Sequence, residues 1–443
     1  MKKNRALWTG VASAAILFTG VTAAKAIPGF APVTYIPIPA SSANREVGGA
    51  FISFDISTYD PASGMFYLGD RSNAGIDIFN LNNNTFVGTL AAGQFSGHQS
   101  SNAASGADGT AVFNVTAGSA TVPVGTKLVL GGDGNSTVKA YVVPQNTPGN
   151  LATYNSTPVY TVSTVLPGST VAASLRADEM TYNPHGNNVL VANNAASPSP
   201  FTTLFNATTG AIISQTVYDG TNGTPNAVGQ SIEASAYDPV HNVFWLAIPQ
   251  IGASASDPGG LSEVNGDTGA VIATFAFSSI PGVTACSPTG VGISTGGSVA
   301  VGCSAGGSQT ILFDTTSHHF STVAFSGTDA VTFDPQINAF LLSGANNVPK
   351  SFGIIDAATG LLNQTPSTSP GNDHSIDGGQ LPNSMVNVIG VPEPANANNN
   401  AACLKGCLEV FSDALAVPEP GTLPVLATGM VVLAGFAFRR RLN

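Results

Sequence analysis

Four acidic residues recur in one short motif along the chain, and they are the residues best placed to do chemistry. In each copy an acidic residue is followed by three residues, an aromatic residue, Asp or Asn, and Pro. The copies begin at Asp55, Asp178, Glu233 and Asp329. The closing Asp-Pro or Asn-Pro dipeptide is a turn signal that ends a β-strand. The motif therefore predicts an acidic side chain at the start of each of four equivalent strands.

His374 occupies a matching position near the end of the chain, in the segment 373–378. If the equivalent strands line one channel, the four acidic side chains and this imidazole meet at its mouth. A ring of carboxylates needs a bound cation or shared protons to relieve its mutual repulsion. Oxygen ligands with one histidine suit a divalent cation, and Ca²⁺ is the first candidate. The sequence thus predicts one divalent cation in the channel.

Two other roles compete with metal binding at these positions. The acidic side chains could instead cap backbone N–H groups of a neighbouring strand, or face solvent in a wet channel. Glu179 could replace Asp178 as a ligand, since strand alternation lets only one of two neighbours face the channel. A metal-dependent hydrolase of lactones or esters would use the same ring. We assign no catalytic residue from the sequence.

The elements that must position this ring are short β-strands arranged in repeats. A second strand follows each motif region, and its seven copies are residues 65–68, 127–130, 188–191, 243–246, 298–301, 339–342 and 385–388. A third strand follows each copy, Gly- and Asn-containing turns separate them, and no helical period is present. Seven units of four short strands predict an all-β, seven-bladed β-propeller. A β-sandwich is the alternative, which seven ordered copies disfavour.

The ring must also close, because the seventh unit lacks a fourth strand of its own. Residues 33–38, at the start of the mature chain, have the composition of a strand and can supply it. The prolines in this stretch suit an outermost edge strand. We therefore expect the mature N-terminal strand to close the ring.

The strand and loop sequences at residues 67–79 and 189–194 resemble the YVTN-type and lactonase-like seven-bladed propellers. The resemblance extends over roughly residues 30–415 and implies the propeller fold. Such propellers include surface proteins, ligand binders and some hydrolases, so the resemblance leaves the function open.

Residues 1–26 have the three parts of a secretory signal peptide. Lys2, Lys3 and Arg5 form a positive region, residues 7–21 are apolar, and residues 24–26 match a small-x-small cleavage site. An N-terminal membrane anchor is the alternative, but the apolar stretch is short for a span. The propeller is therefore expected to occupy residues 27–415 of an exported chain.

Residues 416–443 form a second targeting segment. The motif Val417, Pro418, Glu419 and Pro420 precedes an apolar run at 423–438, and Arg439, Arg440 and Arg441 follow it. The basic cluster would hold that end in the cytoplasm. This order resembles the PEP-CTERM sorting signal of Gram-negative bacteria. It implies export by the secretion machinery, transient inner-membrane insertion, and processing by an exosortase-type enzyme. A second copy at 391–394 has no apolar run behind it and is interpreted as a Pro-rich loop.

The chain contains four cysteines, and disulfides persist in exported proteins. Three pairings are possible. Cys286 and Cys303 flank a predicted hairpin, and Cys403 and Cys407 are close in sequence. We expect these two local pairs; a metal site at the second pair is the alternative.

Composition excludes two broad classes of protein. Hydrophobic residues make up 43% of the chain, which is too apolar for a wholly disordered protein. Lys and Arg number 14 against 25 Asp and Glu, so no basic surface exists for nucleic acid.

The favoured function is an exported cell-surface or extracellular-matrix propeller that binds extracellular polysaccharide or surface proteins. The alternative is the metal-dependent hydrolase.

Overall fold

The computed structural model describes residues 27–146, 149–305, 309–345, 350–368, 374–395 and 401–413. The predicted signal peptide (1–26) and the sorting residues Val417–Pro420 and Arg439–Arg441 lie outside this part of the chain. Within it, no helix combines the length and the apolar character that crossing a membrane requires.

The described residues form 28 strands in seven antiparallel four-stranded sheets. Blade 1 consists of β2 (Phe54–Asp60), β3 (Met65–Asp70), β4 (Gly75–Asn80) and β5 (Thr85–Leu90). Blade 2 consists of β6 (Thr110–Asn114), β7 (Lys127–Asp133), β8 (Thr137–Val142) and β9 (Tyr160–Ser163). Blade 3 consists of β10 (Met180–Asn183), β11 (Asn188–Asn193), β12 (Phe201–Asn206) and β13 (Ile212–Val217). The predicted seven-bladed propeller is confirmed.

Blades 4 to 7 repeat the same order from the channel outward. Their strands are β14 (Ser235–Asp238), β15 (Val243–Ile248), β16 (Gly260–Asn265), β17 (Val271–Ala276); β18 (Pro288–Ile293), β19 (Ser298–Cys303), β20 (Thr310–Asp314), β21 (Phe320–Val323); β22 (Val331–Asp334), β23 (Ala339–Leu342), β24 (Gly353–Asp356), β25 (Leu362–Gln364); and β26 (Asp377–Gln380), β27 (Asn387–Glu393), β28 (Cys407–Ser412), β1 (Ala31–Pro37). Helical structure is limited to α1 (Val171–Ser174) and five single 3₁₀ turns: η1 (Val47–Gly49), η2 (Asn102–Ala104), η3 (Leu151–Thr153), η4 (Phe277–Ser279) and η5 (Ala401–Cys403).

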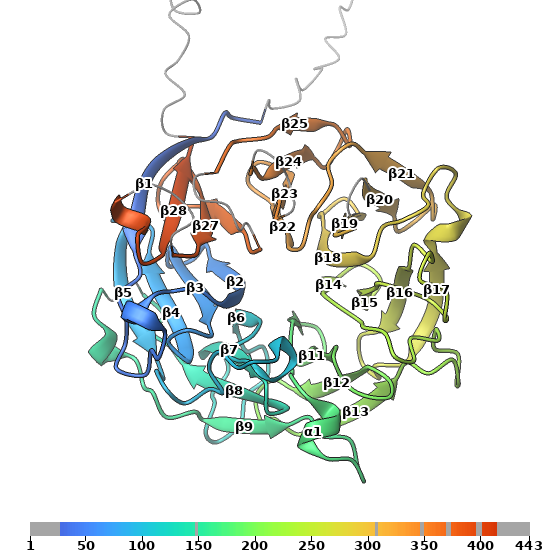
Figure 1. Ribbon diagram of the computed structural model, residues 1–443, viewed down its shortest axis with the longest axis horizontal. Helices are drawn as coiled ribbons and strands as arrows, with labels where there is room; N and C mark the ends of the chain where they lie inside the picture. The colour runs from blue at the N-terminus through green and yellow to red at the C-terminus, as the bar shows by residue number, and fades with distance from the viewer. Residues whose placement is uncertain are drawn as a thin grey trace, which may run out of the picture.

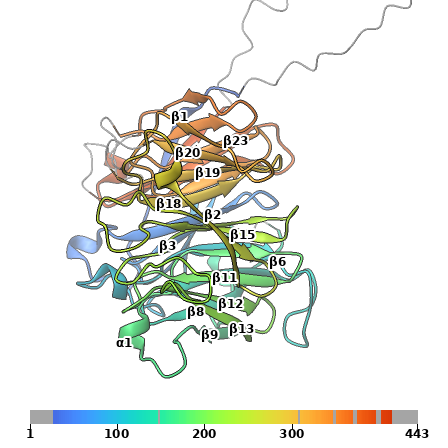
Figure 2. The same cartoon turned by 90° about the vertical axis from the view of Figure 1, so that its right-hand side faces the viewer.

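The blades form a ring around a central channel, with the first strand of each blade innermost (Figure 1). Each of these first strands contacts the first strand of the next blade, and β26 contacts β2 to complete the circle. From the side, the molecule is a disc, and α1 projects at one of its faces (Figure 2).

The middle strands of the blades are buried on both faces because neighbouring blades cover them. Every residue of β3, β11 and β15 is buried. This explains why those strands read as continuous apolar runs rather than as an alternation of apolar and polar residues. The cores lie between blades: Leu68 of blade 1, for example, shares a cluster with Val410 of blade 7.

The mature N-terminal strand closes the ring, as predicted. β1 pairs with β28 along almost its whole length, from Ala31 opposite Ser412 to Pro37 opposite Cys407. In Figure 1 the N-terminal strand lies directly beside the C-terminal one. The seventh sheet therefore combines the two ends of the propeller.

Blade 7 also corrects two sequence interpretations. Its second strand is β27 (Asn387–Glu393), not residues 385–388, and it includes the segment interpreted as a Pro-rich loop. Pro392 pairs with Leu408 of β28. On its other side β27 pairs with β26 only as far as Gly390, so an unpaired edge remains where a proline is tolerated.

Both predicted disulfides are present, Cys286–Cys303 and Cys403–Cys407. The first joins the residues just before β18 to the end of β19, and the second spans the approach to β28. Both therefore constrain single blades rather than linking neighbouring blades.

If β1 stabilises the ring, Ile36→Ala should destabilise the protein. Ile36 is 3% exposed and packs in the cluster between blades 7 and 1. Its truncation should lower the free energy of unfolding by about 2–5 kcal/mol in a urea titration. Val33→Ala is the matched control, because Val33 lies on the same strand but is 48% exposed. Equal effects of the two substitutions would contradict a packing role for β1.

Candidate binding site at the channel mouth

The predicted acidic residues gather at one end of the channel. Asp55 is the second residue of β2, and Arg71 directly follows β3. In antiparallel neighbours, the start of one strand lies beside the end of the next. The starts of the inner strands and the turns after the second strands therefore meet at one face, which we call the channel mouth.

Arg71 joins the first two blades at the mouth. Its Nε donates to Asp108 Oδ1 at 2.9 Å, and its NH2 donates to the same oxygen at 2.7 Å. The NH2 group also donates to Asp55 Oδ2 at 2.5 Å. The NH1 group donates to Asn102 Oδ1 at 2.7 Å. With 4% of its side chain exposed, Arg71 is a buried counter-ion for two buried carboxylates.

Arg176 plays the same role at the start of blade 3. Its NH2 lies 2.6 Å from Asp178 Oδ2, and its NH1 lies 4.0 Å from Asp55 Oδ2. Its Nε donates to Asn194 Oδ1 at 2.9 Å. The Asn194 amide in turn donates to Asp178 Oδ2 and, at 3.1 Å, to Glu233 Oε2. This chain of contacts connects blades 1, 3 and 4.

His374 connects the remaining blades. Its Nε2 lies 2.9 Å from Asp55 Oδ1, and its Nδ1 contacts Asp329 Oδ2. The imidazole thus bridges the carboxylates of blades 1 and 6 from its place just before β26. The structure places Asp55, Asp178, Glu233, Asp329 and His374 at the same face of the ring, and direct contacts join some of them.

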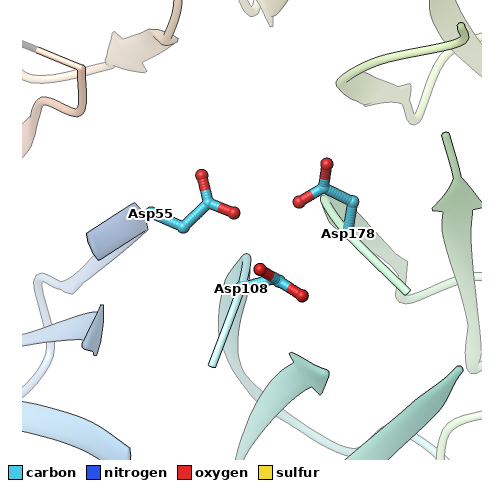
Figure 3. A group of neighbouring side chains, drawn as sticks. All are labelled: Asp55, Asp108 and Asp178. Carbon is cyan, nitrogen blue, oxygen red and sulfur yellow. The ribbon is translucent and has the colours of Figure 1, made fainter. Parts of the chain in front are cut away.

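The carboxylates of Asp55, Asp108 and Asp178 point toward one another across the mouth (Figure 3). One oxygen from each lies within 4.8 Å of the others. Arg71 and Arg176 already bond these groups, so the protein supplies their counter-charge itself. We interpret this trio as architecture.

A second trio consists of Asp178, Glu179 and Glu233, again with ligand atoms within 4.8 Å of one another. Asp178 Oδ1 and Glu179 Oε2 are buried and accept no hydrogen bond from any of the described residues. Both neighbours contribute to the trio, so the expectation that only one could face the channel is wrong. Strand alternation does not apply because residues 178 and 179 precede β10, which begins at Met180.

Burial raises the pKa of most of these carboxyl groups. It raises the pKa of Asp178 and Glu179 well above their usual range, and that of Asp108 to about 7. For Glu179, the charge of Glu233 raises it further. The pKa of Glu233 is also raised by burial. A cation placed among these groups would favour their ionised forms.

The surroundings of Asp55 and His374 instead favour the charged form of each side chain. Burial alone would raise the pKa of Asp55, but Arg71 and His374 outweigh it and hold that pKa far below its usual range. Burial would lower the pKa of His374, yet Asp329 and Asp55 raise it to about 10. His374 is therefore a cation at neutral pH, and it forms ion pairs with two carboxylates.

A cavity of about 160 Å³ lies in the channel beside the second trio. Glu179 and Asp329 line it at the mouth, and Asp377 lines it further in. The remaining wall is mixed: Ser57, Thr58, Thr110, Ser235 and Thr332 carry hydroxyl groups, and Ile56, Met180, Val291 and Val331 are apolar. The cavity is large enough to hold water molecules beside the acidic groups.

The sequence interpretation did not include Asp108, Arg71, Arg176 or Asn194. Asp108 has a weak signal, because Phe113-Asn114 follows it as an incomplete copy of the motif. Arg71 and Asn194 lie in turns, and Arg176 lies between α1 and β10, outside the motif. Their places in the loops at the channel mouth bring them to the acidic groups.

Removal of Arg176 should destabilise the fold, since Asp178 and Asp55 would lose a buried counter-ion. We expect Arg176→Gln to lower the free energy of unfolding at pH 7 by about 3–5 kcal/mol. Urea denaturation followed by tryptophan fluorescence measures this. Arg45→Gln is the matched control, because Arg45 is exposed and should tolerate the change. A loss below about 1 kcal/mol for Arg176→Gln would contradict the role of counter-ion.

The His374 ion pairs predict a specific pH dependence. Because its folded pKa of about 10 exceeds the ordinary 6.5, the stabilisation is complete below pH 6.5. It is lost as the pH rises through about 10. The difference in melting temperature between the wild type and His374→Gln should therefore be largest near pH 6 and shrink toward pH 10. A difference that does not change with pH would show that His374 is neutral in the folded state.

Comparisons with known proteins bear on the fold and on targeting. Residues 416–441 match the PEP-CTERM protein-sorting motif. The propeller is similar to the crystal structure of the WD40 β-propeller domain of Doa1, with a TM-score of 0.50 and 12% identity over 86% of this chain and 97% of that one. At this identity the likeness concerns the fold alone. No curated protein sequence matches the chain.

These comparisons do not select the YVTN or lactonase-like subtype, which remains a prediction. The sorting motif indicates export, and the seven sheets give the propeller fold. The chain is an exported β-propeller protein that carries a PEP-CTERM motif, is sorted by an exosortase, and is transiently anchored in the membrane by its C-terminal tail before it reaches the surface.

Proposed function

We propose that this protein is a binding protein of the cell surface or extracellular matrix, and that its channel mouth binds a divalent cation. The observation that carries the proposal is the trio of Asp178, Glu179 and Glu233. Two of its oxygens are buried without a hydrogen-bond donor. Such groups are costly unless a donor or a cation meets them.

The donor set favours Ca²⁺ over softer metals. All three side chains offer oxygen, which is the ligand that Ca²⁺ prefers, and the neighbouring cavity can hold further water ligands. Asp178 Oδ2 is bonded to Arg176, so its unpartnered Oδ1 is the oxygen available to the ion. Asp55, Asp329 and His374 satisfy one another and would position the site rather than ligate the metal.

The acceptor groups also define the class of ligand. Around the trio, the donors of Arg71 and Arg176 are engaged with carboxylates and amide oxygens. The free groups are therefore hydrogen-bond acceptors, and they would repel an anion. This supports a cation as the first ligand. An extracellular polysaccharide or a surface protein could then reach the face that carries the ion.

The described surface carries no exposed aromatic side chain of the kind that stacks on sugar rings. Its exposed large hydrophobic residues are all aliphatic, Met385 at 90% and Val47 at 96% among them. Binding at the mouth would therefore depend on charge and coordination rather than on aromatic stacking.

The alternative function, a metal-dependent hydrolase of lactones or esters, would depend on the same ion. A bound ion could polarise a carbonyl oxygen or activate a water molecule. The two functions differ in one respect: a binding protein retains the cation without turnover of lactone or ester substrates.

Calcium titration of the purified full-length chain tests the cation site. We expect one Ca²⁺ per chain by isothermal titration calorimetry and a rise in melting temperature on binding. Glu179→Gln and Glu233→Gln should each weaken the affinity at least tenfold, because each removes a charged ligand. Asp267→Asn is the control, since Asp267 is 52% exposed and lies at the other end of the blades.

Absence of stoichiometric binding by the wild-type chain would overturn the cation site. Hydrolysis of a lactone or ester panel that requires Ca²⁺ and fails in Glu179→Gln would instead favour the hydrolase. Binding without turnover supports the proposed function.

A further inference from the structure

A second cavity lies at the face opposite the mouth. It has a volume of about 430 Å³ and runs along the junction between blades 5 and 6. One wall comes from blade 5, with the turn after β18 and the ends of β20 and β21. The other wall comes from blade 6, with Asn338 and the turn 357–360. We call this cavity the blade 5–6 groove.

Two corresponding junctions in the ring are bridged by side chains. Between blades 2 and 3, the Tyr160 ring lies against Gly210, and its hydroxyl donates to Ala207 O at 2.5 Å. Between blades 3 and 4, Ser214 Oγ donates to Thr268 O at 2.6 Å. In both cases a side chain of the outermost strand reaches the turn of the next blade.

Ser321 is the equivalent residue of blade 5. It pairs with Leu312 on β20, as Tyr160 pairs with Ala140 on β8 and Ser214 pairs with Leu204 on β12. No hydrogen bond within the described residues joins blade 5 to the turn 357–360. Gly360 of that turn is approached only by Leu312. The Ser321 side chain makes no hydrogen bond within the described residues, so no hydrogen bond from β21 closes the groove toward that turn.

The lining of the groove is rich in groups that both donate and accept hydrogen bonds. They are the hydroxyls of Ser294, Thr295, Ser298, Ser321 and Thr359, the amide of Asn338 and the imidazole of His319. Leu312 and Phe313 form an apolar part of the wall, and Asp314 provides a carboxylate. No Lys or Arg lines the groove, so a phosphate or carboxylate ligand would find no counter-ion there.

The groove has the groups of a binding site rather than of a catalytic one. No hydrogen bond among the described residues connects the side chains of Ser294, His319 and Asp314. Instead, Ser294 Oγ accepts from the Ser298 N–H at 3.0 Å. Asp314 Oδ1 accepts from the N–H of Thr316 and of Ser317, which fixes its own turn. The serine and the carboxylate therefore have structural partners already.

We propose that the blade 5–6 groove binds a neutral saccharide unit. Its volume lies within the range of small-ligand sites. Its wall of hydroxyl, amide and imidazole groups matches the many donors and acceptors of a sugar ring, and Asp314 disfavours acidic sugars. The inference deepens the proposed binding role by naming a ligand class, and the groove is separate from the cation site.

The test is titration of the purified full-length chain with neutral tetrasaccharides built from glucose, galactose or N-acetylglucosamine, with a uronate tetrasaccharide for comparison. Ser321→Tyr should fill the groove as Tyr160 fills the blade 2–3 junction, and it should weaken saccharide binding at least tenfold without lowering the melting temperature. Asn338→Ala should also weaken binding. Thr322→Tyr is the matched control: Thr322 is exposed and adjacent on the same strand, but it points to the other side.

Each result of the saccharide titrations either supports the proposal or overturns it. Binding of a neutral tetrasaccharide by the wild type and by Thr322→Tyr, with its loss in Ser321→Tyr, supports the proposal. Failure of every neutral saccharide to bind, binding only of the uronate, or unchanged binding by Ser321→Tyr overturns it. The titrations are run both with Ca²⁺ and after chelation, so a failure of the groove is distinguished from a failure of the cation site.

Discussion

The pairing of β1 with β28 is the interaction on which the rest of the structure depends. It joins residue 31 to residue 412 and so closes seven sheets into one ring. Only a closed ring brings β26 against β2 and places His374 beside Asp55. The pairing also makes β1, with its prolines, the outermost strand of the seventh blade, a position that suits proline.

Closure creates an electrostatic problem at the mouth, and the chain largely solves it internally. Six carboxylates converge there, from Asp55, Asp108, Asp178, Glu179, Glu233 and Asp329. Arg71, Arg176 and the protonated His374 offset part of that charge through direct contacts. What remains is concentrated on the trio of Asp178, Glu179 and Glu233, where burial raises every pKa. The cation proposal rests on this uneven distribution of charge rather than on the number of acidic residues.

The two faces of the disc have different chemistry. The mouth is formed by strand starts and presents acceptors that repel anions, whereas the opposite face consists of turns and holds the blade 5–6 groove. In the groove, Ser321 stands at the position where Tyr160 bridges the junction of blades 2 and 3. An exported propeller with these two faces could bind a cation and a saccharide at once, because the two sites share no residue.

The sequence by itself determined the C-terminal sorting signal, the seven blades, the closing strand, both disulfides and the acidic positions at the strand starts. These follow from local patterns: turn dipeptides, apolar runs, repeat order and cysteine spacing. Tertiary structure alone decided which charges meet. Arg71, Arg176 and Asn194 stand outside any repeated motif. Arg71 meets Asp108 of blade 2 and His374 meets Asp329 of blade 6, and local spacing does not encode such contacts because they join residues far apart in the chain.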